Sequence, residues 1–206
     1  MKLTIIGAGP GGYSAAFAAA KAGVEVTLVE RAKLGGTCLH TGCIPTKTLR
    51  SSADVLEMSG RLAEFGITGE CALKADMPAI VNRKRKVTAT LQNGLEKACA
   101  QLKVRVVYGK AGLVSAKLVH VTTAEGTEEV ESDNVIIATG SSPLELPALP
   151  VDHARVLSSD DALELQAVPP SLIIVGGGVI GCELAFIYRA FGSKVTVVEG
   201  QNRVLP

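Results

Sequence analysis

Two glycine-rich turns constrain the fold of this 206-residue chain more than any other feature. The first, GAGPGG, and the second, GGGVIG, each follow a short apolar run and precede a segment of helical composition. In both copies an expected strand then ends in a glutamate, 18 residues after the third glycine: Gly12 precedes Glu30 (12 to 30) and Gly181 precedes Glu199 (181 to 199). The equal offset in equal context argues against chance and predicts one structural unit used twice.

Each part of this unit has a mechanical role in a Rossmann-like α/β fold. The first glycine allows a tight turn, the second lets the backbone approach a pyrophosphate, and the third lets the helix pack against the strand. The helix N-terminus presents N–H groups to phosphates, and the acid can accept hydrogen bonds from a ribose. The residues assigned to the first site are Gly7, Gly9, Pro10, Gly12 and Glu30. Those assigned to the second are Gly176, Gly177, Gly178, Val179, Ile180, Gly181 and Glu199.

Two such sites in one chain suit hydride transfer between a flavin and a nicotinamide. The acid of the second copy favours NAD, because Glu199 would repel the 2′-phosphate of NADP, which usually binds beside a cation. Arg203 lies four residues further on, so NADP remains an alternative.

Composition excludes several other classes of protein. The formal net charge is +1, aromatic residues are 3% and tryptophan is absent, so we expect neither a basic field nor stacking platforms for nucleic acid. The N-terminal apolar run is too short for a signal peptide. The uncharged stretch 167–182 is interrupted by Pro169, Pro170 and the run Gly176–Gly178, and falls short of the ~18 apolar residues of a membrane span. We therefore expect a cytoplasmic location and no membrane partner.

The segment GGTCLHTGCIPTK carries Cys38 and Cys43. Zinc sites usually separate paired ligands by about two to four residues and add a second pair elsewhere. The other cysteines and the three histidines form no recognisable ligand set, so no metal is predicted, although a zinc module remains the weakest alternative. In a reducing cytoplasm a cysteine pair is more often catalytic or metal-binding than a structural staple.

A disulfide in this segment has a geometric requirement. Positions i and i+5 of an ideal helix lie roughly 8.6 Å apart, whereas bridged Cα atoms lie within ~7 Å. The segment therefore cannot be regular helix throughout if the sulfurs bond, and Gly42 supplies the freedom to bend it. Pro45 suits the first turn of a helix that begins near Cys43. That helix N-terminus and Lys47 both favour a thiolate.

The cysteine segment closely resembles the redox-active disulfide of the FAD-dependent pyridine nucleotide–disulfide oxidoreductases, whose usual form is GGTCxNxGCxPxK. Within that family it most resembles the dihydrolipoyl dehydrogenases. The resemblance covers the entire chain, because GAGPGG resembles the FAD fingerprint, VIIATGSSP the ATG motif and GGGVIGCE the NAD fingerprint. His40 and Thr41 replace the commoner Asn-Val, and Thr46 replaces Ser. A mercuric or glutathione-like reductase is the alternative within the family, although glutathione reductases often carry basic residues where this chain has Thr46 and Glu199.

The resemblance implies a role for each matched residue. Cys43 would be the thiol nearest the flavin, forming the charge-transfer thiolate, and Cys38 would be the interchange thiol that meets the substrate. Lys47 would lie near the flavin and pair with Glu183. The FAD-binding set would be Gly7, Gly9, Pro10, Gly12, Glu30, Arg31, Gly35, Gly36, Thr37, Cys38, Lys47, Ala111, Ala138, Thr139 and Gly140. Electrons would pass from dihydrolipoamide, borne by a lipoyl carrier protein, through the disulfide to FAD and then to NAD.

The resemblance also implies a domain organisation. Residues 1–150 would form an FAD-binding domain, and 151–206 the start of an incomplete NAD-binding domain. Neither the Gly-Asp nor the His-Pro dipeptide of the family's later segments occurs, so the C-terminal interface domain with its base histidine is expected to be absent. The chain would then be the N-terminal part of a longer homodimeric enzyme and inactive alone. The alternative is a non-catalytic dinucleotide-binding fragment.

The middle of the chain predicts a long helix over 76–102 and four strands, with a hairpin turn at 124–126. The predicted strands are 104–107, 113–115, 118–123 and 135–138, which would include a small antiparallel sheet. The basic run at 83–86 is expected to be a solvated helix face. Cys71, Cys99 and Cys182 are expected to be small packing residues.

Overall fold

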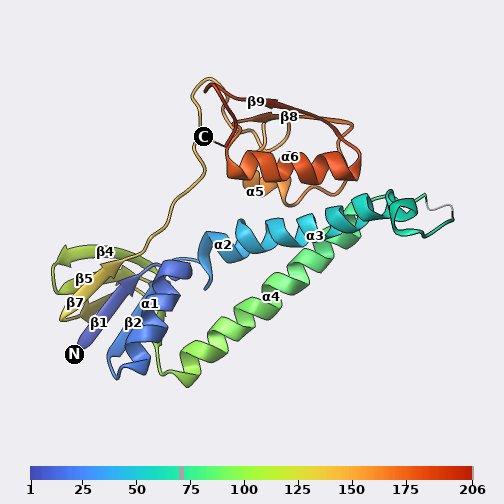
Figure 1. Ribbon diagram of the computed structural model, residues 1–206. Coiled ribbons are helices and arrows are strands. Elements are labelled where there is room, and N and C mark those ends of the chain that lie inside the picture. Colours follow the sequence, from blue (N-terminus) through green and yellow to red (C-terminus); the bar gives the residue numbers. More distant parts are fainter. Residues whose placement is uncertain (70–71, 206) are drawn as a thin grey trace. The chain divides into compact units, whose positions relative to one another are not determined.

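The computed structural model describes residues 1–69 and 72–205 (Figure 1). They form two compact units, and each glycine turn lies in a different one. The first unit combines Met1–Gly42 with Thr88–Ser142, and the second combines Cys43–Val87 with the chain from Pro143 onward. The predicted assignment of 1–150 to FAD and 151–206 to NAD concerns bound cofactors and stays a prediction.

The first unit contains a parallel sheet of four strands in the order β3-β2-β1-β7. The strands are β1 (Lys2–Ile6), β2 (Glu25–Glu30), β3 (Arg105–Tyr108) and β7 (Asn134–Ile137). All three pairings are parallel. This order, in which the first strand lies between the second and the last, is that of a Rossmann-type dinucleotide-binding half. The predicted α/β class is confirmed.

Side chains that alternate along these strands build three layers. Leu3 and Ile5 of β1 pack with α1 (Pro10–Lys21), which lies across β1 and β2, and with Cys99 near the end of α4 (Figure 1). Val29 of β2 faces the opposite way and packs on an antiparallel sheet. That sheet contains β4 (Lys110–Ser115), β5 (Leu118–Thr122) and β6 (Thr127–Glu131). Helices, parallel sheet and antiparallel sheet therefore form the predicted three layers.

Two strand predictions need correction. Strand β6, with the sequence TEEVE, is missing from the predicted set, because its glutamates hide the single core residue, Val130. Strand β4 begins at Lys110 and not at Leu113, because its first residues pair with Thr122 and its neighbours on β5 although they have little β propensity. Both strands are defined by long-range pairing, which local composition does not reveal.

The connection between β2 and β3 contains several helices. They are α2 (Gly36–His40), α3 (Cys43–Ser59), the 3-10 helix η1 (Leu62–Phe65) and α4 (Met77–Gln101). The predicted long helix is confirmed by α4, whereas Cys71 lies outside the described residues. Within the described ranges no helix combines the length and the apolar character needed to cross a membrane.

The second unit contains a parallel strand pair, β8 (Ser171–Val175) and β9 (Lys194–Val198), joined by α6 (Val179–Phe191). Helix α6 runs along one side of the pair (Figure 1) and packs on α3. The short helix α5 (Ser159–Ala162) adds Ala162 to the same core. Tyr188 of α6 is fully buried there and donates its hydroxyl to the Ala162 carbonyl, and burial raises the pKa of Tyr188 to about 12.

The basic run at 83–86 was expected to form a solvated helix face, but the structure buries one of its side chains. The Lys84 side chain is 2% exposed and donates to the Leu163 carbonyl at 2.7 Å, and it also pairs with Glu164. Arg85 is exposed and contacts the other carboxylate oxygen of Glu164 at 2.8 Å. The prediction was wrong for Lys84 because its partners lie about 80 residues away in the sequence.

Candidate active site

The first glycine turn connects β1 to α1 and leaves no room for side chains at two positions. Gly7 has a φ of +99°, and a Cβ there would lie 2.3 Å from the Ala138 carbonyl oxygen. A Cβ at Gly12 would lie 1.7 Å from the Gly7 oxygen and 3.5 Å from Ile5. The predicted tight turn and close helix packing are therefore confirmed, whereas the phosphate contact at Gly9 stays a prediction.

The start of α1 has the features of an anion site. Gly9 is the N-cap in an extended conformation, and no side chain in the described part of the chain caps the helix. Pro10 has no N–H, and the first turn carries no acidic residue. A Cβ built on Gly9 would lie 4.0 Å from the Gly36 Cα, so the space above the turn is open. Backbone donors of the first turn therefore fit the pyrophosphate of a dinucleotide.

Glu30, the predicted ribose acceptor, is buried at the end of β2. One carboxylate oxygen accepts from the Ala8 amide at 2.8 Å, and the other accepts from the Ala32 amide at 2.9 Å. Each oxygen has a second lone pair, so hydroxyl donors of a ribose can still bind. The sequence did not predict the roles of Ala8 and Ala32, although Ala8 occupies the middle of the GxG pattern.

Five further predicted FAD residues of this unit lie after β2, on β4 and at the end of β7. Ala138 donates its amide to the Ile6 carbonyl at 2.8 Å and packs beside the glycine turn. Thr139 and Gly140 are exposed beyond the end of β7, and Arg31 is exposed after β2. Ala111 lies on β4 and packs into the core between the two sheets. The structure thus brings Ala138 to the turn, and the cofactor contacts of the other residues stay predictions.

Helical structure is interrupted between Cys38 and Cys43, as a disulfide between them would require. Helix α2 begins after Gly35, which has a φ of +107°, and ends at His40, because the φ of −137° at Thr41 is not helical. Helix α3 then starts at Cys43. A Cβ at Gly42 would lie 2.9 Å from the Thr37 oxygen, so only glycine fits the break. The predicted interruption is confirmed.

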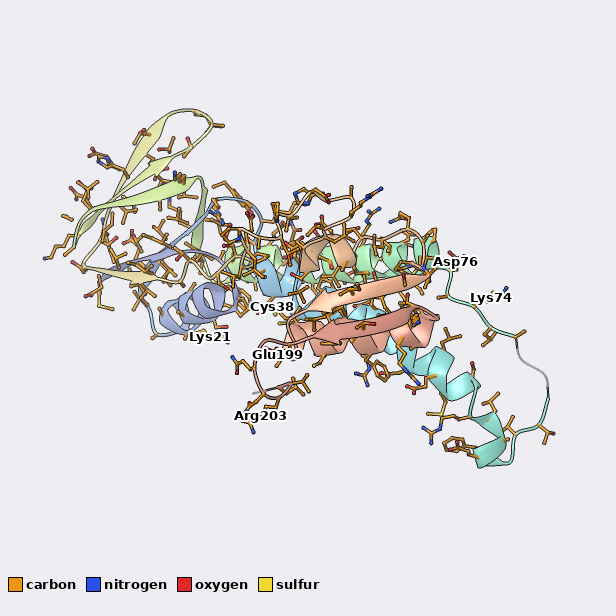
Figure 2. All side chains as sticks on the ribbon, turned by 90° about the horizontal axis from the view of Figure 1, so that it is seen from above. Lys21, Cys38, Lys74, Asp76, Glu199 and Arg203 are labelled. Atoms are coloured by element: carbon orange, nitrogen blue, oxygen red, sulfur yellow. The ribbon has the colours of Figure 1, made fainter. Side chains whose placement is uncertain are left out.

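The two cysteines differ in exposure. Cys38 is half-buried on α2 (Figure 2), and Cys43 is exposed as the first residue of α3. Pro45 is buried in the first turn of α3, as predicted. The joining of Cys38 and Cys43 in a disulfide stays a prediction.

His40 fixes the end of α2 to the preceding loop. Its Nε2 atom lies 2.8 Å from the Leu34 carbonyl oxygen. Because a carbonyl can only accept, Nε2 carries the proton and donates. The sequence did not predict this contact. It showed only that His40 and Thr41 replace the Asn-Val that is usual in the family.

Lys47 and Glu183 form the expected ion pair between α3 and α6, within the second unit. Arg50, one turn further along α3, places its guanidinium carbon 3.5 Å from the centre of the Phe186 ring. It also binds Asp54 at 2.7 Å. The cation–π contact of Arg50 was not predicted, because the residues lie more than a hundred positions apart.

The second glycine turn repeats the first. Gly176 has a φ of +104°, and a Cβ at Gly181 would lie 2.1 Å from the Gly176 oxygen. Gly178 is the N-cap of α6, again without a side-chain cap from the described residues, and the first turn has no acidic residue. Val179 and Ile180 are exposed on this turn. The backbone therefore fits a second pyrophosphate in the same way as the first.

Glu199 lies at the end of β9, and Arg203 lies in the segment that follows (Figure 2). The Glu199 carboxylate accepts from the Gln201 amide at 2.8 Å and from the Gly177 amide at 2.6 Å. These backbone bonds, the one from Gln201 first, hold the pKa of Glu199 below its usual value. The side chain is therefore a carboxylate at neutral pH.

Comparison with known proteins places these features in a family. Residues 1–206 match the model of the pyridine nucleotide-disulphide oxidoreductases. The chain is 44% identical over its whole length to a dihydrolipoyl dehydrogenase of Bacillus subtilis, and 44% identical over 99% of its length to one of Chlorobaculum parvum. It covers 45% and 44% of these proteins. The chain thus spans about half the length of the curated relatives it matches.

Solved structures of similar proteins support the same family. LpdA from Mycobacterium tuberculosis matches the whole chain with a TM-score of 0.92 and 32% identity, over 46% of its own length. The HOCl-induced flavoprotein disulfide reductase RclA from Escherichia coli, as its Cu(II) complex, matches 98% of the chain with a TM-score of 0.83 and 32% identity, over 42% of its own length. The repeated glycine turns, the interrupted cysteine segment and these matches lead to one conclusion: the chain belongs to the pyridine nucleotide–disulphide oxidoreductase family.

Proposed function

We propose that this chain is the redox and dinucleotide-binding part of a dihydrolipoyl dehydrogenase, which oxidises dihydrolipoamide and passes the electrons to NAD. The observation that carries the proposal is the helix break at Thr41–Gly42, which separates Cys38 on α2 from Cys43 at the start of α3. Identities of about 44% to proteins named dihydrolipoyl dehydrogenase support the choice of substrate.

The thiol chemistry begins with a thiolate of dihydrolipoamide that attacks Cys38 Sγ of the Cys38–Cys43 disulfide. The protein S–S bond breaks, and Cys43 leaves as a thiolate. The second substrate thiolate then attacks the substrate sulfur of the mixed disulfide, which releases oxidised lipoamide and the Cys38 thiolate. Two electrons have moved from the substrate to the cysteine pair, and the two substrate thiols have lost their protons.

The chain's own residues favour this direction of attack. Cys43 opens the 17-residue helix α3, and the positive end of the helix dipole stabilises the negative charge on the leaving sulfur. Lys47 lies one turn further on, and Glu183 holds its ammonium group. The half-buried Cys38 on α2 is then the sulfur that meets the substrate.

The first glycine turn and Glu30, with the other residues predicted from the resemblance, would hold FAD, and the second turn with Glu199 would hold NAD. When bound, these groups supply two-electron transfer from the cysteine pair to a soluble carrier. Glu199 supports NAD over NADP, because a second negative charge beside the carboxylate is repelled. Arg203, four residues after Glu199, supplies a cation of the kind that binds a 2′-phosphate. NADP is therefore the alternative cofactor to compare with NAD.

We also propose the wider setting of this activity. Residues 1–150 would bind FAD and 151–206 would begin the NAD-binding domain of a cytoplasmic homodimer, which accepts a lipoyl carrier protein. Because the curated relatives are about twice as long, the 206 residues alone are expected to bind FAD weakly and not to turn over dihydrolipoamide.

The repeated N-caps offer a matched test. Gly9→Asp and Gly178→Asp add a good N-cap residue at positions where the helix N-terminus tolerates a side chain: a Cβ at Gly9 would lie 4.0 Å from Gly36, and one at Gly178 meets nothing described within 4 Å. Each carboxylate repels a pyrophosphate. Flavin fluorescence quenching should show that the parent chain binds FAD and that Gly9→Asp weakens binding by at least about tenfold, or ~1.4 kcal/mol.

Calorimetry should show the reverse selectivity for NAD: Gly178→Asp should weaken NAD binding, and Gly9→Asp should leave it unchanged. A parent chain that neither quenches FAD nor binds NAD at millimolar concentration contradicts the proposed function. Equal FAD affinity in the parent and in Gly9→Asp contradicts the assignment of the first turn.

A further inference from the structure

We propose that Glu30 is a positioning residue for the thiol segment: its carboxylate clamps the first glycine turn, and the turn in turn holds helix α2, on which Cys38 lies. The role given to Cys38 rests on the proposed function, whereas the clamp is a property of the first unit alone. Ribose binding by Glu30 does not require this second role.

The clamp passes through a single buried residue. The Ala8 amide donates to Glu30 at 2.8 Å, and the Ala8 carbonyl accepts from the Gly35 amide at 2.9 Å. Ala8 is fully buried, and Glu30 is 8% exposed. Both polar groups of one turn residue are therefore paired, one with the acid that ends β2 and the other with the residue that precedes α2.

A direct backbone contact reinforces these bonds. A Cβ at Gly36 would lie 2.7 Å from the Gly9 Cα and 3.2 Å from the Gly9 nitrogen. The first residue of α2 thus rests on the glycine turn, and Cys38 follows two residues later. Because packed backbones cannot shift independently, displacement of the turn also displaces the start of α2.

The second unit contains the same clamp. The Gly177 amide donates to Glu199 at 2.6 Å, and the Gly177 carbonyl accepts from the Leu205 amide at 2.8 Å. The other Glu199 oxygen accepts from Gln201, as the other Glu30 oxygen accepts from Ala32. In this copy the clamp holds the segment after β9, which carries no cysteine. The chain therefore provides its own matched control.

Substitution of glutamine separates the clamp from side-chain size. Glu30→Gln retains one acceptor oxygen, but its NH2 group faces the second amide and cannot accept from it. The Ala8 amide then donates to a neutral oxygen in place of a carboxylate, or faces the NH2 group. Either outcome weakens the connection from β2 through Ala8 to Gly35. Glu199→Gln does the same in the second unit.

The experiment measures alkylation of the reduced chain by iodoacetamide without FAD, NAD or lipoamide. Trypsin releases residues 34–47, and fragment ions separate labelling at Cys38 from labelling at Cys43. We expect Glu30→Gln to accelerate labelling of Cys38 about tenfold, the factor that corresponds to ~1.4 kcal/mol. Cys99, which is 3% exposed in the core of the same unit, reports global opening and should stay unlabelled.

Glu199→Gln should leave the Cys38 rate within about twofold of the parent rate, a change of ~0.4 kcal/mol, because its clamp lies in the second unit. An unchanged Cys38 rate in Glu30→Gln overturns the proposal, and so does a parallel rise of Cys38 and Cys99. Hydrogen exchange on the unsubstituted chain adds a test that needs no variant: the Ala8 and Gly35 amides should open together, and independent rates overturn the clamp. A chain that binds no FAD contradicts the proposed function but leaves these outcomes intact.

Discussion

The ammonium group of Lys47 on α3 is paired with the carboxylate of Glu183 on α6, inside one compact unit. Lys47 is 61% exposed and Glu183 is 24% exposed. Pairs with one such exposed partner contribute little to stability, because water and salt screen them. The pair instead fixes a positive charge one turn beyond Cys43.

Lys47→Ala should therefore lower the free energy of unfolding by less than about 1 kcal/mol. Arg50→Ala is the matched variant on the same helix, and it should cost more because it removes both the contact with the Phe186 ring and the Asp54 pair. Urea unfolding followed by circular dichroism measures both. A larger loss for Lys47→Ala than for Arg50→Ala would show that the ion pair is a main stabiliser of the α3–α6 contact.

Alanine should destabilise the chain to a similar extent at the third glycine of each glycine turn. At Gly12 and Gly181 a methyl group would overlap a carbonyl oxygen of the turn, at 1.7 Å and 2.1 Å, and we expect each substitution to cost about 3 kcal/mol or more. Gly94→Ala is the control, because a Cβ in this part of α4 meets no described atom within 4 Å. It should stabilise the chain by up to about 1 kcal/mol. Thermal unfolding that leaves Gly12→Ala as stable as the parent would exclude the observed turn geometry.

Lys84 should contribute more to the free energy of unfolding than its neighbour Arg85, although both bind Glu164. Lys84→Met removes one buried and one partly buried donor bond and leaves the Leu163 carbonyl without this donor, so we expect a loss of about 2–3 kcal/mol. Arg85→Met removes one contact from a side chain that is 63% exposed and should cost less than about 1 kcal/mol. Equal losses in chemical unfolding would mean that Lys84 is solvated, as the sequence suggested.

The same cluster predicts a pH dependence. Burial alone raises the pKa of Glu164, but hydrogen bonds from Lys84 and Arg85 outweigh it, and the net pKa is lowered. The folded chain then binds fewer protons than the unfolded chain, so the stabilisation is present above the unfolded pKa of about 4.3 and is lost as pH falls through the lowered folded value. The difference in unfolding free energy between the parent and Glu164→Gln should shrink from pH 6 to pH 3. A constant difference would contradict this linkage.

Local patterns predicted the parts of the molecule that depend on neighbours in the chain. The tight turn at Gly7, the helix that starts at Cys43 and the break at Gly42 all follow from residue type and spacing. Features that depend on distant partners were not predictable. Lys84 is buried because a carbonyl 79 positions away accepts a hydrogen bond from its ammonium group, and β6 is a strand because β5 pairs with it.

The site divides in the same way. Glu30 was recognisable from its offset after Gly12, but its bond to Ala8 joins residues 22 positions apart. The pairing of Lys47 with Glu183 was expected from a family resemblance and not from physical pattern, because 136 positions separate the two residues.

That Cys38 and Cys43 exchange electrons with a dithiol is tested most directly by the mass of one peptide. Trypsin releases residues 34–47, which contain both cysteines. In buffers with varied ratios of lipoamide to dihydrolipoamide, we expect this peptide to change from the dithiol to an internal disulfide lighter by two hydrogen atoms. The oxidised fraction should follow a two-electron curve, with a tenfold change in ratio for each ~30 mV. A peptide that stays a dithiol at every ratio, or that joins Cys38 or Cys43 to a different cysteine, would contradict the redox assignment.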